Sequence, residues 1–346
     1  VLQLAAQAGL AANPFVQAYR ALYGLITEKS EQHYLSVKQA IEKHGYDFED
    51  KTLADFFTYA RNFCIGRINA GEGRYFDELF YLYEQGLQKR VLLLNGEINE
   101  RNYKNIVTTA LRTRRHGWTL DFINEYRYQL NKTVRDNAYN YNMANYLFHT
   151  AQYDKALRNL QKVQLSDLFY GLDARSLMLK CYFEMDEKEA FLNAYYSFRV
   201  FVQRRKNVSE QHRKNYLNFL RIAKKLMNLR PRDKKAIAVL QKEIATATAL
   251  ADKNWLQEKL SDGFAETTML LENLVKIMEA EEQAEKMGEA APENFMLVDE
   301  KGNLKNIEMD QVKSDAAGTV ASRTHEANLP LKHLFFLGLH DHHTLT

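Results

Sequence analysis

Apolar positions recur three and four residues apart along most of the chain, a spacing that places them on one face of an α-helix. The pattern continues to about residue 288, and in "LADFFTYARNFCIGRI" it runs until Gly71 and Gly73. The alternation of apolar and polar residues that predicts strands is not sustained in this part of the sequence. The pattern therefore predicts a series of helices joined by short breaks.

Local signals predict where several of these helices begin and end. Asn13 before Pro14 predicts a capped helix start, and Ser30 predicts a second one whose helix ends at Gly45. Further helices are expected over "YFDELFYLYEQGLQKRVLLL", up to Asn95-Gly96, over "ERNYKNIVTTALRTRR", and, after a break at His116-Gly117, over "TLDFINEYRYQL".

The segment "NYLFHTAQYDKALRNLQKV", residues 145–163, contains a break without Gly or Pro. One apolar stripe stops at residues 149–152 and another starts at Tyr153. A single long helix is locally possible, but a tight helical hairpin would repeat at a fixed distance. A shift of 34 residues places Ala156 on Ala190, and the reverse shift places Ala144 on Ala110. We therefore interpret residues 149–152 as the turn of a repeated helical hairpin.

The segment "YNMANYLFHTAQYDKALRNLQKVQL" resembles a tetratricopeptide repeat, a family with this period. Met143 and Ala144 match the large-small pair of its first helix, and Ala156 matches the small residue of its second. Residues 102–130 and 173–200 fit the same pattern less closely, and the chain also resembles helical-repeat proteins of bacteria. The resemblance implies an all-α fold, an α-solenoid of antiparallel helical hairpins in a right-handed superhelix.

In that family the first helix of each repeat lines a concave groove. The resemblance thus implies a non-catalytic scaffold or adaptor that binds an extended, acidic peptide or protein partner. The alternative is that Tyr141 and Tyr182 only pack between repeats. The residues that alignment to Ala156 places in the groove are Lys104, Arg114, Arg115, Tyr141, Asn145, Phe148, His149, Arg175 and Tyr182.

The pattern divides the chain into three parts. Residues 1–263 are expected to form the repeat array, and residues 264–288 an amphipathic helix with an acidic end. Residues 289–346 are expected to form an appendage. Within it, "FMLV" and "LKNIEM", separated by Asp299 to Asn303, predict a small β-hairpin, and a small polar linker follows.

Residues 201–235 contain twelve Lys or Arg and two acidic residues. We interpret these basic residues as the solvent-exposed face of a helix. The alternatives are pairing with the acidic segment from Glu279 to Glu293, or a nucleic-acid-associated protein that uses this stretch. Tyr216 and Phe219 belong to the apolar stripe, so no aromatic residues on the polar face support base stacking.

Composition and motifs narrow the remaining possibilities. The net charge is only +3, no run of 18 apolar residues predicts a membrane span, and Cys64 and Cys181 form no paired motif. We expect buried thiols, a cytoplasmic location, and packing roles for Trp118 and Trp255. No phosphate-binding loop, GxSxG or HExxH motif is present, so we expect neither an enzyme nor a cofactor. A metal site remains an alternative at His333, His340, Asp341, His342 and His343.

Overall fold

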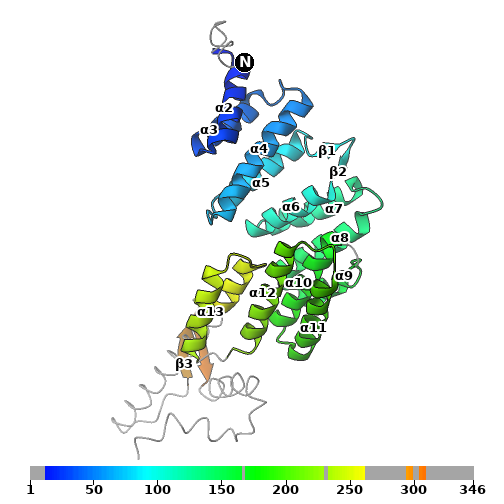
Figure 1. Ribbon diagram of the computed structural model, residues 1–346, viewed down its shortest axis with the longest axis vertical. Helices are drawn as coiled ribbons and strands as arrows, with labels where there is room; N and C mark the ends of the chain where they lie inside the picture. Colours follow the sequence, from blue (N-terminus) through cyan, green and yellow to red (C-terminus); the bar gives the residue numbers. More distant parts are fainter. Residues whose placement is uncertain (1–11, 166–167, 230–232, 262–293, 299–303, 309–346) are drawn as a thin grey trace, which may run out of the picture. The chain divides into compact units, whose positions relative to one another are not determined.

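A computed structural model describes residues 12–165, 168–229 and 233–261, together with strands at 294–298 and 304–308 (Figure 1). The chain divides into two compact units, Val1–Val200 and Phe201–Thr346. The expected array of residues 1–263 crosses this division, and its boundaries stay a prediction. Within the described ranges, no helix is both long and apolar enough to cross a membrane.

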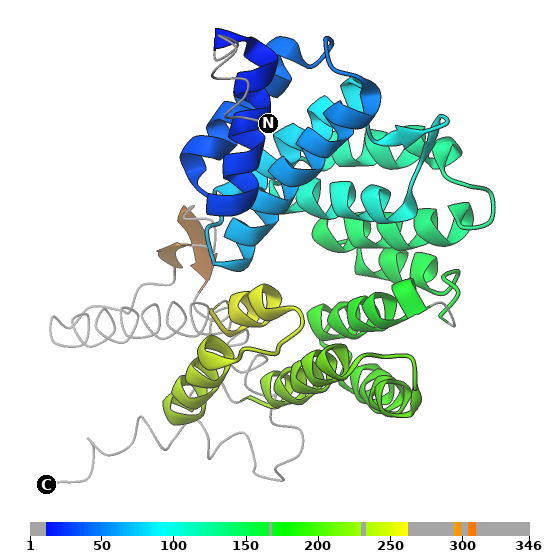
Figure 2. The same ribbon diagram turned by 45° about the horizontal axis from the view of Figure 1, so that its top comes forward.

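The first unit is built from α-helices in pairs, as the periodicity predicts. Neighbouring helices in the sequence pack on one another, and Figures 1 and 2 show them as adjacent ribbons. The predicted caps are confirmed, because Asn13 Oδ1 accepts from the amide of Phe15 at 2.9 Å and Ser30 Oγ from that of His33 at 3.3 Å. The helices are α2 (Pro14–Glu28), α3 (Glu31–His44), α4 (Asp50–Asn69), α5 (Tyr75–Gln88), α6 (Glu100–Arg112), α7 (His116–Tyr126), α8 (Arg135–His149), α9 (Tyr153–Leu160), α10 (Leu168–Glu184) and α11 (Lys188–Arg204).

One turn geometry joins α6 to α7, α8 to α9 and α10 to α11. One residue of each turn has a φ of 55–57°, and the next amide donates to the carbonyl oxygen five residues earlier, at 2.8–3.0 Å. This arrangement satisfies carbonyl groups that the end of a helix leaves unpaired. The predicted hairpin at residues 149–152 is thereby confirmed. The left-handed residues are Arg114, Ala151 and Asp186.

The predicted break at His116-Gly117 is wrong. Both residues are the first of α7, and the chain turns instead at Thr113–Arg115. The left-handed residue there is Arg114, with a φ of 57°. A search for glycine misplaces the turn because an arginine adopts the conformation that glycine usually supplies.

The predicted helix up to Leu94 is also too long. Helix α5 ends at Gln88, and a two-residue antiparallel pair follows, β1 (Leu93–Leu94) with β2 (Glu97–Ile98). Asn95 and Gly96 between them have φ values of 52° and 81°, as the tight turn of a β-hairpin requires. The hairpin separates the α4–α5 pair from the α6–α7 pair.

Small residues lie where helices α8 and α9 pack. Ala144 and Ala156 are both 0% exposed, and their small side chains allow the two helices to approach closely. Trp118 stacks on Phe122 at 5.3 Å, and Trp255 is 4% exposed beside Phe219, so both tryptophans have the expected packing role.

Both cysteines are buried, as predicted. Burial raises the pKa of the Cys64 thiol to about 12 and that of the Cys181 thiol to about 12. The two thiols are therefore protonated at neutral pH.

The second unit contains α12 (Glu210–Met227), α13 (Lys234–Thr246) and a helical stretch at residues 253–261. Strands β3 (Asn294–Val298) and β4 (Leu304–Glu308) pair antiparallel, from Asn294 opposite Glu308 to Val298 opposite Leu304. The predicted hairpin in the appendage is therefore confirmed. The expected helix over 264–288, the polar linker and the terminal histidines lie outside the described residues.

Candidate functional site: one face of three helices

Helices α6, α8 and α10 are the first members of three successive pairs, and each packs on the next of the three. Except for two turn residues, the predicted groove residues lie on these helices. The face that they share is the candidate site.

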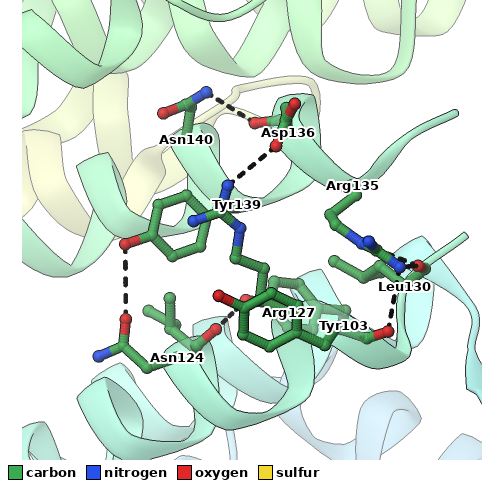
Figure 3. Close-up of polar contacts among 10 residues, drawn as sticks. Tyr103, Asn124, Arg127, Leu130, Arg135, Asp136, Tyr139 and Asn140 are labelled. Atoms are coloured by element: carbon green, nitrogen blue, oxygen red, sulfur yellow. Dashed lines mark hydrogen bonds and ion pairs between the residues drawn. The ribbon is translucent and has the colours of Figure 1, made fainter. Parts of the chain in front are cut away.

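Hydrogen bonds hold α6 and α8 against α7 (Figure 3). The hydroxyl of Tyr103, next to Lys104, donates to the carbonyl oxygen of Ile123 at 2.7 Å. Burial raises the pKa of Tyr103, so this hydroxyl keeps its proton. Tyr139 of α8 donates to Asn124 Oδ1 of α7 at 3.4 Å.

Two arginines fix the point where α8 begins. Arg127 Nη2 forms an ion pair with Asp136 Oδ1 at 3.0 Å, and its guanidinium lies 4.1 Å from the ring centroid of Tyr139. Arg135 Nη2 donates to the carbonyl oxygen of Leu130 at 2.8 Å. These contacts hold the beginning of α8 against the segment that follows α7.

The structure brings Lys104 of α6 together with Tyr141 of α8. Lys104 Nζ lies 5.3 Å from the ring centroid of Tyr141 and 5.7 Å from that of Tyr170. It also forms an ion pair with Asp173, 69 residues later on α10. We call Lys104, Tyr141, Tyr170 and Asp173 the Lys104 cluster; it joins three helices through a cation, two rings and a carboxylate.

The other predicted residues of α8 lie largely inside the packing of the helices. Asn145 and Phe148 are each 9% exposed, and Tyr141 is 7% exposed. The Phe148 ring lies 5.6 Å from that of Tyr153 and 5.3 Å from Lys180 Nζ. Neighbouring residues therefore cover most of these three side chains. His149, in contrast, is exposed at the end of α8.

Arg114 and Arg115 lie in the α6–α7 turn and are exposed. Arg115 reaches α5, where its guanidinium lies 4.3 Å from the ring centroid of Phe80 and 3.6 Å from Asp77 Oδ1. The contacts of Arg115 thus join it to the neighbouring pair of helices, not to the Lys104 cluster.

Two predicted residues lie on α10. Arg175 Nη1 donates to Ser197 Oγ of α11 at 3.5 Å, and Tyr182 is half-buried. Arg175 is also half-buried, so part of its guanidinium faces solvent. Of the cations predicted for the groove, Lys104 and Arg175 therefore lie on α6 and α10, whereas Arg114 and Arg115 lie in the α6–α7 turn.

Sequence reasoning missed Tyr170, Asp173 and Lys180. The 69 residues between Lys104 and Asp173 are about two repeat lengths, so a search at twice the period would have proposed the pair. Tyr170 and Lys180 gave no such signal, because only the packing of α10 on α8 places them beside Tyr141 and Phe148.

Several cations of the basic stretch 201–235 bind other parts of the second unit. The guanidinium of Arg213 donates to carbonyl oxygens of Val202, Gln203, Arg205 and Val208 at the end of α11. Arg221 and Lys225 both pair with Glu243 of α13. Burial by itself raises the pKa of Glu243, but its hydrogen bonds to Lys225 and Arg221 outweigh this and lower it. These contacts reduce the charge that the stretch can offer to nucleic acid.

Among the described residues, no group of three or more His, Cys, Asp or Glu side chains is arranged to hold a metal ion. The alternative metal site at the terminal histidines falls outside those residues.

The sequence was compared with protein-family models and with curated proteins. No family model matches the chain. No curated protein matches it either. The arrangement of its own side chains is therefore the basis on which a function can be assigned.

Proposed function

We propose that this protein is a non-catalytic scaffold that binds an extended acidic segment of a protein partner along the face of α6, α8 and α10. In this proposal the helical pairs are repeats of the tetratricopeptide type, stacked as a right-handed solenoid, and the first helices line its groove. Such arrays present long surfaces and rarely form a deep enclosed pocket. The same proposal includes the acidic partner, the tetratricopeptide type of the repeats and a cytoplasmic location for the protein.

The observation that carries it is the Lys104 cluster. Side chains from three successive first helices meet there, across 69 residues of sequence. The contact requires α6, α8 and α10 to lie side by side, which is the arrangement a continuous binding face needs.

The chemistry of the face indicates the kind of partner. Arg114 and His149 are exposed at the ends of α6 and α8, and Arg175 is half-exposed on α10. Carboxylates of a ligand would form charge-assisted hydrogen bonds with such groups, each contributing roughly 1.5–3 kcal/mol where water is excluded. Arginine is also one of the residues most often responsible for affinity at protein interfaces.

The test is the double substitution Arg114→Glu with Arg175→Glu. Binding of a fluorescein-labelled peptide of Asp and Glu is followed by fluorescence anisotropy, and the helical content by circular dichroism. We expect a loss of affinity of about 100-fold or more, since two charge-assisted contacts become repulsive. We expect the helical content to stay at the wild-type value. The substitution of the exposed Arg114 should change stability by about 0.5 kcal/mol, whereas that of the half-buried Arg175 also removes its hydrogen bond to Ser197 and should lower the Tm by a few degrees.

The matched control is Arg158→Glu with Lys162→Glu. These two residues are exposed on and just after α9, the second helix of its pair, and the pair of substitutions changes the net charge equally. If both double variants lose the same affinity, attraction by overall charge explains the binding. Unchanged binding by the Arg114/Arg175 variant would exclude this face.

A further inference from the structure

Arg61 of α4 is a part-buried cation. Among the described residues, no carboxylate forms an ion pair with it, and its Nη1 atom is shielded from solvent without a hydrogen-bond partner. Burial lowers the pKa of this guanidinium, as expected for a charge removed from water without compensation. Arg61 thus differs from Lys38, Arg67 and Lys104, which are part-buried cations of the first unit that pair with Glu78, Glu72 and Asp173.

The contacts that Arg61 does make are neutral. Its Nε donates to the carbonyl oxygen of Phe57 at 3.2 Å, and its Nη2 to Thr58 Oγ1 at 3.3 Å. The guanidinium lies 5.4 Å from the ring centroid of Tyr83 on α5, and the Asn105 side chain of α6 hydrogen-bonds to Tyr83. The residue is therefore held in one place by α4 and α5, close to the beginning of α6.

A charge in this position lowers the stability of the fold. Replacing a partly buried, uncompensated charge by an apolar side chain of similar size is commonly neutral or stabilising. The sequence nevertheless has an arginine here, and its Nη2 atom faces Thr58, which is exposed. A carboxylate that approached Nη2 would exchange the neutral bond to Thr58 for an ionic one.

We propose that Arg61 is an anion-binding residue that pairs with a carboxylate of the acidic partner segment. The inference rests on the proposed function and adds to it. Helix α4 is the first helix of its pair, as α6, α8 and α10 are of theirs. The partner segment would then meet a cation on α4 in addition to the groups on α6, α8 and α10.

The test combines stability with binding in one variant, Arg61→Met, which keeps the length of the side chain and removes its charge. We expect its Tm to rise above that of the wild type, because the uncompensated charge is gone. We expect its affinity for the labelled Asp and Glu peptide to fall roughly tenfold or more, the equivalent of one charge-assisted hydrogen bond. A merely structural arginine would not produce this combination.

Arg20→Met is the matched control, since Arg20 is exposed on α2 and the same charge is removed. Equal affinities of the Arg61→Met and Arg20→Met variants would overturn the inference, and so would a fall in both Tm and affinity of Arg61→Met. Arg61→Lys keeps the charge without the planar fork and should bind between the wild type and Arg61→Met. Failure of the proposed function itself is distinguishable, because the wild-type protein would then not bind the peptide.

Discussion

At the scale of single residues, the left-handed turn positions explain how the helical pairs form without glycine. Arg114, Ala151 and Asp186 each have a φ near 55°. For residues with a Cβ atom this conformation costs roughly 1–2 kcal/mol relative to a right-handed one. The hydrogen bonds that close each helix end offset this cost.

Ala151→Gly should therefore stabilise the protein. Glycine removes the steric cost at a φ of 55°, but it loses more entropy on folding, so we expect a net gain of about 0.5–1 kcal/mol. Thermal unfolding followed by circular dichroism would measure it as a rise in Tm. Ala156→Gly is the control: this alanine is 0% exposed within α9, and the same substitution should lower the Tm. A decrease for both variants would contradict the assigned turn geometry.

At the scale of secondary-structure elements, polar side chains connect second helices of neighbouring pairs. Glu78 of α5 accepts hydrogen bonds from Tyr34 at 2.6 Å and from Lys38 at 2.8 Å, both on α3. Tyr81 of α5 donates to Glu42 of α3 at 2.7 Å. These contacts align α3 with α5 in addition to the apolar core between them.

Glu78 should make the stability of the protein dependent on pH. Burial by itself raises the pKa of Glu78, but its hydrogen bonds to Lys38 and Tyr34 outweigh this and hold the pKa below its usual value of 4.5. A carboxylate with a lowered folded-state pKa stabilises the fold above its unfolded-state pKa, and this contribution is lost as the pH falls through the folded-state pKa. Glu78→Gln should therefore be less stable than the wild type at pH 7, and the difference should shrink below about pH 4.5.

Urea unfolding at a series of pH values measures this difference. Glu125→Gln, which changes an exposed carboxylate on α7, is the control and should show little dependence on pH. A constant difference between Glu78→Gln and the wild type from pH 7 to pH 3 would show that the carboxylate charge contributes nothing.

At the scale of the whole molecule, the charge distribution gives little support to binding of nucleic acid. The net charge of the chain is +3, and Arg213, Arg221 and Lys225 of the basic stretch already bind groups of the second unit. A chain that used this stretch on nucleic acid would have to give up those contacts or rely on the cations that remain.

We therefore expect weak binding of labelled single- and double-stranded DNA, with little dependence on salt. Each phosphate that a protein neutralises on duplex DNA contributes about −0.9 to the slope of log K against log salt concentration. Fluorescence anisotropy across a range of salt concentrations gives this slope. A steep slope that Lys206→Glu and Lys214→Glu abolish would instead identify residues 201–235 as a nucleic-acid site.

The sequence by itself determined the helical class, the caps at Asn13 and Ser30, the pairing of α8 with α9 and the β3–β4 hairpin. Each of these depends on neighbours within a few turns of the chain, where periodicity and local hydrogen bonding decide the conformation. The 34-residue shift also selected Lys104, which the structure places beside Tyr141 and Asp173, but it did not select Lys180. It could not show that Tyr141 and Phe148 are buried, because exposure depends on which helix packs alongside.

Only the tertiary structure decided which charges have partners. Lys104 meets Asp173 on a helix that lies two pairs later, whereas Arg61 meets a carbonyl, a hydroxyl and a ring in the part of the chain that the structure describes. The tertiary structure was also needed to place the turn at Arg114, because no glycine marks that turn. It was needed as well for the end of α5 at Gln88, because the apolar run in the sequence continues past this residue. Electrostatic and packing energies depend on distances between helices, and a local pattern in the sequence does not contain those distances.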